Sequence, residues 1–313
     1  MRTNSYKELS LVQEMKSHIT FLGTGQAVPT KSRNHTGILL SYGPENILVD
    51  CGEGIQRQFR IAKINPCSLT RLLITHWHGD HILGIPGLLQ TLAMNNYHKT
   101  LHIYGPEKTQ QYINDLIRLF AIRRELKLQI HELHPGKIIE EKDFYIEALN
   151  MDHNVPCLAY AFIEKEKFRI HKEKLEKLKI PPSPLLKKLQ QGEDIQIGER
   201  KIKASEVTYK QSGKRITFIL DTAVNENMLK IAEHADLFIC ESTYTSKEED
   251  KAKEYKHMTS EQAAQTAKKA DVKRLILIHI SQRYEGKERI MLKEAKKIFK
   301  NTSIANDFDE VAI

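Results

Sequence analysis

The sequence predicts a layered α/β domain interrupted by one charged insertion, and three observations lead to this class. Short apolar, β-branched runs alternate with segments of helical periodicity in two separate series along the chain. Residues 163–205 break this alternation with densely charged sequence. The 313 residues, 40% of them hydrophobic, suffice for a large packed core, and no stretch approaches the roughly 18 apolar residues of a membrane helix.

The first series begins at His18, after a polar, aperiodic stretch that we interpret as an N-terminal extension over residues 1–16. The fold is then expected to occupy residues 17–313. Helical spacing at Ile55, Phe59 and Ala62 predicts one helix, and longer periodic segments predict two more over 83–94 and 107–120. Strands are expected over 18–22, 36–43, 46–50, 71–75, 101–105, 126–132, 143–149 and 158–163.

The insertion over residues 163–205 holds twelve basic and seven acidic residues, so it carries five of the chain's eight excess positive charges. After it the alternation of strands and helices resumes. Strands are expected at RITFIL (215–220), DLFICEST (236–243) and RLILIHI (274–280), and helices over 227–233, 260–270 and 287–300.

Composition excludes several classes of protein. Four cysteines without a C-x-x-C pair do not form a disulfide scaffold, and they predict reduced thiols in a cytoplasmic protein. The first 17 residues lack the apolar segment of a secretory signal. A net charge of +8 permits a nucleic-acid partner without requiring one. The 14 histidines are more informative, because neutral imidazole is the commonest metal ligand in proteins.

Four potential metal ligands, His76, His78, Asp80 and His81, lie within six residues directly after an expected strand. Residues two apart in extended chain share a side, so His76 and His78 can converge on one ion. A turn at Gly79 can direct Asp80 and His81 toward a second ion. Nitrogen and carboxylate donors at this density suit Zn²⁺ or Mn²⁺, and we favour a metal site over a surface histidine cluster.

Three further candidates each follow an apolar strand: His153, Asp221 and His279. A lone histidine at a strand end is more often a packing residue than a ligand. Together with the first motif, however, these residues complete a set of seven donors, which is enough for a centre of two metal ions.

The complete donor pattern resembles the metallo-β-lactamase superfamily and, within it, the ribonuclease Z family of transfer-RNA 3′ processing endonucleases. The resemblance covers about residues 17–284. Beyond the donors it includes HITFLGTG with the following Val-Pro, the P-x-K-x-R-N loop at Pro29–Asn34, and ILVDCGEGIQRQ with Asp50. It also includes Glu241 in CESTY and His257 in HMTSEQAAQTA. The Lys179–Leu185 stretch resembles part of the family's flexible substrate-binding arm.

The resemblance implies a four-layer αβ/βα sandwich with the arm inserted at 163–205. It implies two zinc ions per subunit, or Mn²⁺ in their place: one held by His76, His78 and His153, the other by Asp80, His81 and His279, with Asp221 bridging. The expected reaction is attack of zinc-bound hydroxide on precursor transfer RNA after the discriminator nucleotide. Asp80 would accept a proton, and His257 paired with Glu241 would donate one.

The resemblance further implies where the substrate is held. Lys31, Arg33 and Asn34 are the expected contacts to the acceptor end, and Pro181 and Pro182 belong to the arm. The family also implies a homodimer. Asp50 is expected to form hydrogen bonds near the ligands without binding metal itself. The chain departs from the family pattern at Trp77, where an aliphatic residue is usual, and at Ser183, where glycine is usual. The run Ile219–Ala223 also lacks the family's glycine before Asp221 and arginine after Thr222.

Two alternatives to the endonuclease remain open at this stage. One is a hydrolase of the same fold that acts on a small phosphodiester or a thioester. The other is an RNA-binding protein that keeps a metal site without catalysis. The arm and the Lys31–Arg33 loop argue against the first, because a small substrate needs neither, and Glu241 with His257 argues against the second.

Overall fold

The computed structural model describes residues 17–122, 126–181 and 183–313. The expected N-terminal extension and Pro182 lie outside the described residues. The chain divides into two compact units. The larger unit comprises residues 16–141, 145–162 and 215–313, and the smaller one contains the inserted residues 163–214 together with 142–144.

Within the described residues, the first sheet of the larger unit has seven strands and is built mainly from the N-terminal half of the chain. Across the sheet the order is β18 (Glu310–Ala312), β1 (His18–Gly23), β2 (Gly37–Tyr42), β3 (Glu45–Val49), β4 (Arg71–Leu73), β5 (Thr100–Gly105) and β6 (Lys127–Glu132). Strands β3, β4, β5 and β6 are mutually parallel, whereas β2 pairs antiparallel with β1 and β3, and β1 pairs antiparallel with β18.

Among the described residues the second sheet also has seven strands. Across the sheet the order is β17 (Thr302–Ile304), β16 (Leu275–Ile278), β15 (Leu237–Glu241), β14 (Arg215–Ile219), β9 (Cys157–Glu164), β8 (Phe144–Met151) and β7 (Gly136–Glu140). Strands β14, β15, β16 and β17 are mutually parallel, so their carboxyl ends meet at one edge of the sheet.

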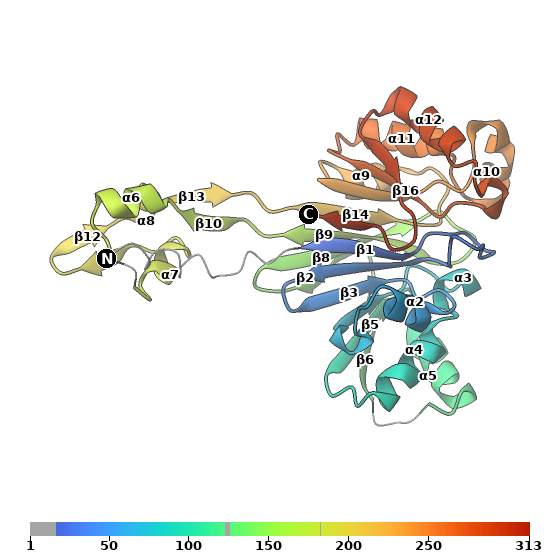
Figure 1. The fold of residues 1–313 in the computed structure, drawn as a ribbon, viewed down its shortest axis with the longest axis horizontal. Helices are drawn as coiled ribbons and strands as arrows, with labels where there is room; N and C mark the ends of the chain where they lie inside the picture. The colour runs from blue at the N-terminus through green and yellow to red at the C-terminus, as the bar shows by residue number, and fades with distance from the viewer. Residues whose placement is uncertain (1–16, 123–125, 182) are drawn as a thin grey trace. The chain divides into compact units, whose positions relative to one another are not determined.

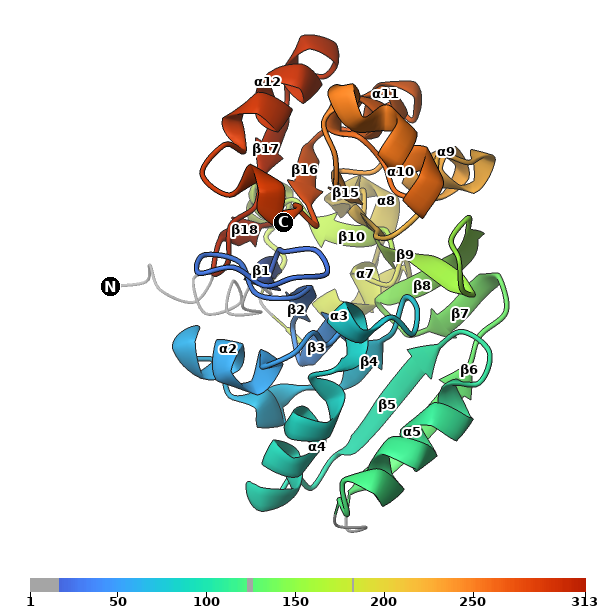
Figure 2. The same ribbon diagram turned by 90° about the vertical axis from the view of Figure 1, so that its right-hand side faces the viewer.

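Helices cover the outer face of each sheet, so the larger unit has four layers (Figures 1 and 2). The first sheet is covered by α2 (Ile55–Ile61), α4 (Ile85–Met94) and α5 (Thr109–Leu119). The second is covered by α9 (Glu226–Ala232), α10 (Glu249–Tyr255), α11 (Ser260–Lys269) and α12 (Arg289–Ile298). The short α3 (Gly79–Ile82) lies at the edge where the sheets meet (Figure 2). This arrangement confirms the expected sandwich.

The expected strands and helices are present with small shifts at their ends. In the larger unit, strands β7, β17 and β18 and helices α3 and α10 were not expected, and no element was expected inside the insertion. The three strands are short and half exposed, so their apolar pattern is weak. Helix α10 is almost wholly polar, with Ala252 as its buried residue, so it carries no hydrophobic periodicity that could predict it.

The smaller unit folds around its own apolar core. Strands β10 (Lys167–Ile170) and β13 (Thr208–Gln211) pair antiparallel and lead to the helices α6 (Lys172–Lys177) and α8 (Ala204–Val207) (Figure 1). Between the helices lie α7 (Leu186–Leu189), β11 (Ile195–Ile197) and β12 (Arg200–Ile202). The buried core residues are Leu175, Ile180, Leu186, Leu189, Ile195, Ile202, Ala204 and Val207. The unit includes the return strand β13 and so extends past residue 205.

Within the described residues, no helix combines the length and the apolar character needed to cross a membrane.

Candidate metal centre

Parallel strands bring the candidate ligands to one edge of the larger unit. In the second sheet, Ile219 of β14 pairs with Cys240 of β15, and Glu241 pairs with Ile278 of β16. The residues that follow these strand ends are Asp221 and His279, so both lie at the carboxyl edge of the sheet. In the first sheet β3 and β4 are parallel neighbours, which places Asp50 beside the segment that leads into His76. Ligands at the carboxyl ends of parallel strands are typical of α/β proteins.

Helix α3 turns the second half of the histidine motif inward. His78 is its N-cap residue, and Asp80 and His81 lie in its first turn. The helix packs closely on the chain beside Asp50: a Cβ on Gly52 would lie 2.8 Å from the Asp80 carbonyl oxygen. A glycine is therefore required at position 52 for this approach. The turn expected at Gly79 is thus a short helix, and it places His81 in the interior of the protein.

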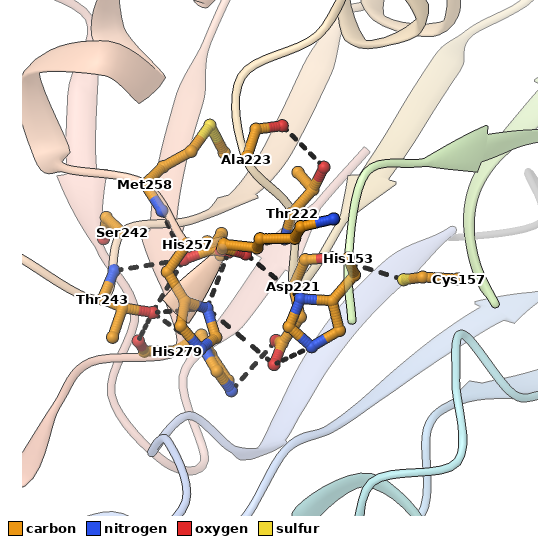
Figure 3. A network of polar contacts seen from close by, with 12 residues as sticks. His153, Cys157, Asp221, Thr222, Ala223, Ser242, Thr243, His257, Met258 and His279 are labelled. Carbon is orange, nitrogen blue, oxygen red and sulfur yellow. Dashed lines mark hydrogen bonds and ion pairs between the residues drawn. The ribbon is translucent and has the colours of Figure 1, made fainter. Parts of the chain in front are cut away.

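Asp221 lies at the centre of the cluster, with one carboxylate oxygen facing each group of histidines. Its Oδ2 lies 3.6 Å from His76 Nε2 and 3.8 Å from His153 Nε2. Its Oδ1 lies 3.3 Å from His81 Nε2 and 3.1 Å from His279 Nε2. Figure 3 shows His153, His279 and His257 arranged around this carboxylate. A carboxylate in this position can contribute one oxygen to each of two metal sites.

The seven residues named from the sequence form two overlapping groups of possible metal ligands. His76, His78, His153 and Asp221 make the first group, and their ligand atoms all lie within 4.8 Å of one another. Asp80, His81, His279 and Asp221 make the second group by the same measure. Within them His78 Nδ1 is 3.1 Å from His153 Nε2. Asp80 Oδ2 is 3.4 Å from both His81 Nε2 and His279 Nε2.

The donor atoms fit metal ions because several are buried without a hydrogen-bond partner. His76 Nε2, His81 Nε2 and Asp221 Oδ1 have no hydrogen-bond partner among the described residues, although all three are buried. A buried polar atom without a partner costs about 1–3 kcal/mol. Three such atoms converging on one small region are explained by cations that they would coordinate. Nitrogen and carboxylate oxygen are donors that Zn²⁺ and Mn²⁺ accept.

The outer nitrogen of each buried histidine is held by a neighbouring group, which fixes the direction of the inner one. His76 Nδ1 lies 3.0 Å from Thr75 Oγ1, and His153 Nδ1 lies 3.1 Å from the Lys256 carbonyl oxygen. Such contacts orient metal ligands in proteins. Burial lowers the pKa of His76 well below its usual value and also lowers that of His153. Both imidazoles are therefore neutral near pH 7, which is the form that binds metal.

The Asp50 carboxylate holds His81 and Thr75 in place without being one of the seven candidate ligands. It accepts hydrogen bonds from the Thr75 backbone N–H and hydroxyl, both at 2.7 Å. Its Oδ2 lies 2.6 Å from His81 Nδ1. Burial alone would lower the pKa of His81, but the carboxylates of Asp221, Asp50 and Asp80 raise it well above its usual value. Asp50 adopts a left-handed backbone with φ 57°, which aspartate and asparagine tolerate better than most residues.

Glu241 and His257 form a second buried pair beside Asp221 (Figure 3). His257 Nδ1 lies 3.0 Å from Glu241 Oε1 and 3.9 Å from Asp221 Oδ2. Burial opposes protonation of His257, yet the Glu241 and Asp221 carboxylates outweigh it and raise the pKa of His257 to about 9. At neutral pH His257 is therefore a cation that can donate a proton. The capping box of Thr259 and Gln262 begins helix α11 just after it.

Thr243 connects this pair to the ligands, and the sequence did not single it out. Its hydroxyl lies 2.7 Å from Glu241 Oε2 and 3.1 Å from His279 Nδ1. The sequence could have indicated Thr243 by its position, two residues after Glu241 in the polar run that follows strand β15.

The loop that contains Lys31, Arg33 and Asn34 divides into an exposed and a buried part. Lys31 is exposed, whereas the Arg33 guanidinium is buried and bound within the chain. Arg33 donates to Thr24 Oγ1 at 2.7 Å, the Ala305 carbonyl oxygen at 2.6 Å and Asn306 Oδ1 at 2.9 Å. This set of contacts assigns Arg33 to holding the loop in place.

Asp307 is a second anchor of the same loop, and nothing in the sequence indicated it. Its carboxylate accepts hydrogen bonds from the Asn34 backbone N–H and the Thr24 hydroxyl, both at 2.7 Å. The Asn34 side chain donates in turn to the Glu53 carbonyl oxygen at 2.7 Å. Of the two arm prolines expected to bind substrate, Pro181 is exposed in the smaller unit, and Pro182 is outside the described residues.

Comparison with known proteins gives two family models that match successive parts of the chain. One, described as anti-Pycsar protein Apyc1, matches residues 17–166. The other, described as a beta-lactamase superfamily domain, matches residues 161–280.

Full-length relatives match almost the whole chain. Ribonuclease Z of Methanothermobacter thermautotrophicus is 40% identical over 296 residues, which cover 94% of this chain and 96% of that protein. Ribonuclease Z of Bacillus velezensis is 35% identical over 303 residues, covering 94% and 98%. Among solved structures, human tRNase Z, short form, gives a TM-score of 0.71 at 27% identity and covers 95% of this chain and 99% of that one. The metallo-β-lactamase fold protein YhfI of Bacillus subtilis gives a TM-score of 0.70 at 19% identity, covering 96% and 100%.

Proposed function

This chain belongs to the ribonuclease Z family of metal-dependent nucleases, and on that premise we propose that it cuts precursor transfer RNA on the 3′ side of the discriminator nucleotide. The products would be a transfer RNA with a 3′-hydroxyl and a trailer with a 5′-phosphate. The observation that carries the proposal is the position of Asp221, with one oxygen toward each of two groups of histidines. During hydrolysis of a phosphodiester, negative charge builds up on the attacking and departing oxygens. Two cations held a few Å apart can stabilise this charge.

We propose that two zinc ions, or Mn²⁺ in their place, are held by the two groups. His76, His78 and His153 would hold one, Asp80, His81 and His279 the other, and Asp221 both. When bound, the ions would supply Lewis acidity and a water whose pKa is lowered to about 7.

The chain's own residues would handle the protons. Asp80 Oδ2 is fixed by the Ala27 backbone N–H at 2.9 Å, and it would accept the proton of the attacking water. His257, kept cationic by Glu241, would give a proton to the departing 3′-oxygen. A positioned acid of this kind contributes about 10²–10⁴-fold to the rate.

Substrate binding would be shared between the two units. Lys31 is proposed to contact a phosphate of the acceptor end, while Arg33 and Asn34 hold its loop. The charged arm, including Pro181 and Pro182, is proposed to bind the body of the transfer RNA electrostatically. A homodimer in the cytoplasm remains part of the proposal on the basis of the family resemblance alone.

The test is cleavage of a precursor transfer RNA that carries a 3′ trailer, with the protein loaded with zinc or manganese. We expect one cut after the discriminator nucleotide, its loss with EDTA and its return with added metal. Analytical ultracentrifugation of the same sample tests the dimer. A metal-loaded protein that binds the precursor and leaves it intact would contradict the proposal.

A further inference from the structure

A cavity of about 450 Å³ in the larger unit is lined in part by residues that neighbour candidate metal ligands in the chain. Its walls include Trp77, Ile82, Tyr112, Leu116 and Val155, and we call it the indole pocket. Trp77 lies between His76 and His78 in the chain, Ile82 directly follows His81, and Val155 lies two residues after His153. Two segments that provide candidate ligands, residues 76–82 and 153–156, therefore also line this cavity.

The aromatic side chains of the indole pocket are held in fixed orientations. Trp77 Nε1 donates to Thr109 Oγ1 at 3.0 Å, and that hydroxyl donates to the Pro106 carbonyl oxygen at 2.6 Å. The rings of Trp77 and Tyr112 meet edge to face with centroids 4.8 Å apart. Because the polar atom of the indole is already bound, the ring offers its carbon surface to an occupant. Trp77 is partly exposed, so that surface is not fully covered by the core.

The charged residues that line the pocket indicate what kind of group it accepts. Glu107, Lys108 and Asp115 contribute to its lining. Two carboxylates and one ammonium disfavour a phosphate inside the pocket. They are compatible with a neutral base, whose amino groups can donate to a carboxylate. An aromatic and aliphatic cavity is a stacking site for a base, and stacking contributes about 1–3 kcal/mol per base.

We propose that the indole pocket binds an unpaired nucleobase of the RNA, next to the phosphodiester that is cleaved. The inference rests on the proposed function, and it adds a binding site for one nucleotide of the substrate. Trp77 is bonded in the chain to His76 and His78, so the backbone that carries two candidate ligands also carries the ring on which the base would stack. The pocket would thus fix the nucleotide whose phosphate reaches the metal centre.

The experiment uses two precursor transfer RNAs, each with a single 2-aminopurine, one at the discriminator nucleotide and one at the first trailer nucleotide. Fluorescence is recorded on titration with the full chain in EDTA, so that bound RNA stays intact. Stacking on Trp77 should quench one of the two probes, and the quenched position identifies the bound base. Trp77→Leu should abolish this quenching, and Trp77→Phe should keep part of it. Phe120→Leu, at an exposed aromatic at the far end of helix α5, is the matched control and should behave as the unchanged chain.

Kinetics with metal-loaded protein provide the second measurement. Trp77→Leu should raise KM for precursor transfer RNA about ten-fold, with hydrolysis of bis(p-nitrophenyl) phosphate unchanged because that substrate has no base. Equal loss on both substrates would mean that the indole only supports the ligands and would overturn the inference. So would the absence of quenching at both positions. If the unchanged chain does not cut the precursor at all, the proposed function fails instead.

Discussion

Asp50 Oδ2 lies 2.6 Å from His81 Nδ1 in a fully buried contact, while His81 Nε2 faces Asp221 and Asp80. The carboxylate therefore determines which nitrogen of His81 is available to a metal ion. His81 thus contacts carboxylates from both sheets, because Asp50 follows strand β3 of the first sheet and Asp221 follows β14 of the second.

Asp50→Asn should weaken metal binding about 10–100-fold, because an amide cannot hold His81 in the same state as a carboxylate does. The backbone at position 50 has φ 57°, which asparagine tolerates, so the change isolates the side chain. Metal content after dialysis against graded chelator measures the effect. Asp271→Asn, at an exposed position with φ 51°, is the matched control. Equal metal retention by the two variants would contradict this role of Asp50.

His257→Ala should lower kcat for precursor transfer RNA about 10²–10⁴-fold while leaving metal content unchanged. The departing 3′-oxygen needs a proton, whereas p-nitrophenolate leaves without one. Hydrolysis of bis(p-nitrophenyl) phosphate should therefore be nearly unaffected. A parallel loss on both substrates would show that His257 acts on the metal centre itself.

The dependence of activity on pH should follow the protonation of His257. Its cationic form is the proton donor, so kcat for precursor transfer RNA should fall as the pH rises through about 9. Glu241→Gln removes the carboxylate that raises this pKa, and the fall should then begin at lower pH, toward the usual value of about 6.5. The measurement is a pH–rate profile of each protein. The profile for bis(p-nitrophenyl) phosphate is the control, and identical alkaline limbs in both proteins would refute the assignment.

Lys31→Ala and Arg33→Ala should have different effects although the residues are two apart. Lys31 is exposed, so its loss should weaken RNA binding and leave the stability of the fold unchanged. The slope of the logarithm of RNA affinity against the logarithm of salt concentration should become smaller in magnitude by about one. Arg33 is buried on three oxygen acceptors, so its loss should lower the free energy of unfolding by about 1–3 kcal/mol. Urea denaturation and KM at several salt concentrations separate the two. Lys300→Ala is the exposed control, and a destabilised Lys31→Ala variant would contradict the division.

Replacing Phe168–Lys210 by Asn-Gly should remove the arm and keep the larger unit. Lys167 pairs with Gln211 across β10 and β13, a register that a two-residue Asn-Gly turn can close. The change removes five net positive charges. We expect a higher KM for precursor transfer RNA, a smaller salt slope and unchanged hydrolysis of a small phosphodiester.

The double variant Lys187→Glu and Lys188→Glu tests the same role of the arm by reversing two charges without deleting any residue. Both lysines are exposed on α7, so the arm core stays intact. It should weaken precursor binding in the same direction as the deletion. Loss of small-substrate hydrolysis in either protein would argue against a role limited to RNA binding.

The sequence predicted the fold class and identified the seven candidate metal ligands, because both depend on local patterns. Short apolar strands with donors at their ends are visible residue by residue, and the parallel order of β14, β15 and β16 then brings Asp221 and His279 together. Arg33 shows the limit of this approach. Its acceptors at Ala305 and Asn306 are more than 270 residues away, and no local pattern distinguishes a buried arginine from an exposed one.

The indole pocket was equally inaccessible from sequence. Trp77 departs from the family pattern in sequence, but its neighbour Tyr112 lies on helix α5, and only the folded chain places the two rings together. Thr243 and Asp307 likewise act through tertiary contacts.

The anchoring of the Pro29–Asn34 loop has a consequence for how the enzyme is made. Asp307 bonds to Asn34 across 273 residues of chain, and strand β18 completes the first sheet only by pairing with β1. A ribosome-bound chain that has not yet released these late residues has an unsupported loop and an open sheet edge. The loop therefore gains this support only after 273 further residues have been synthesised beyond Asn34.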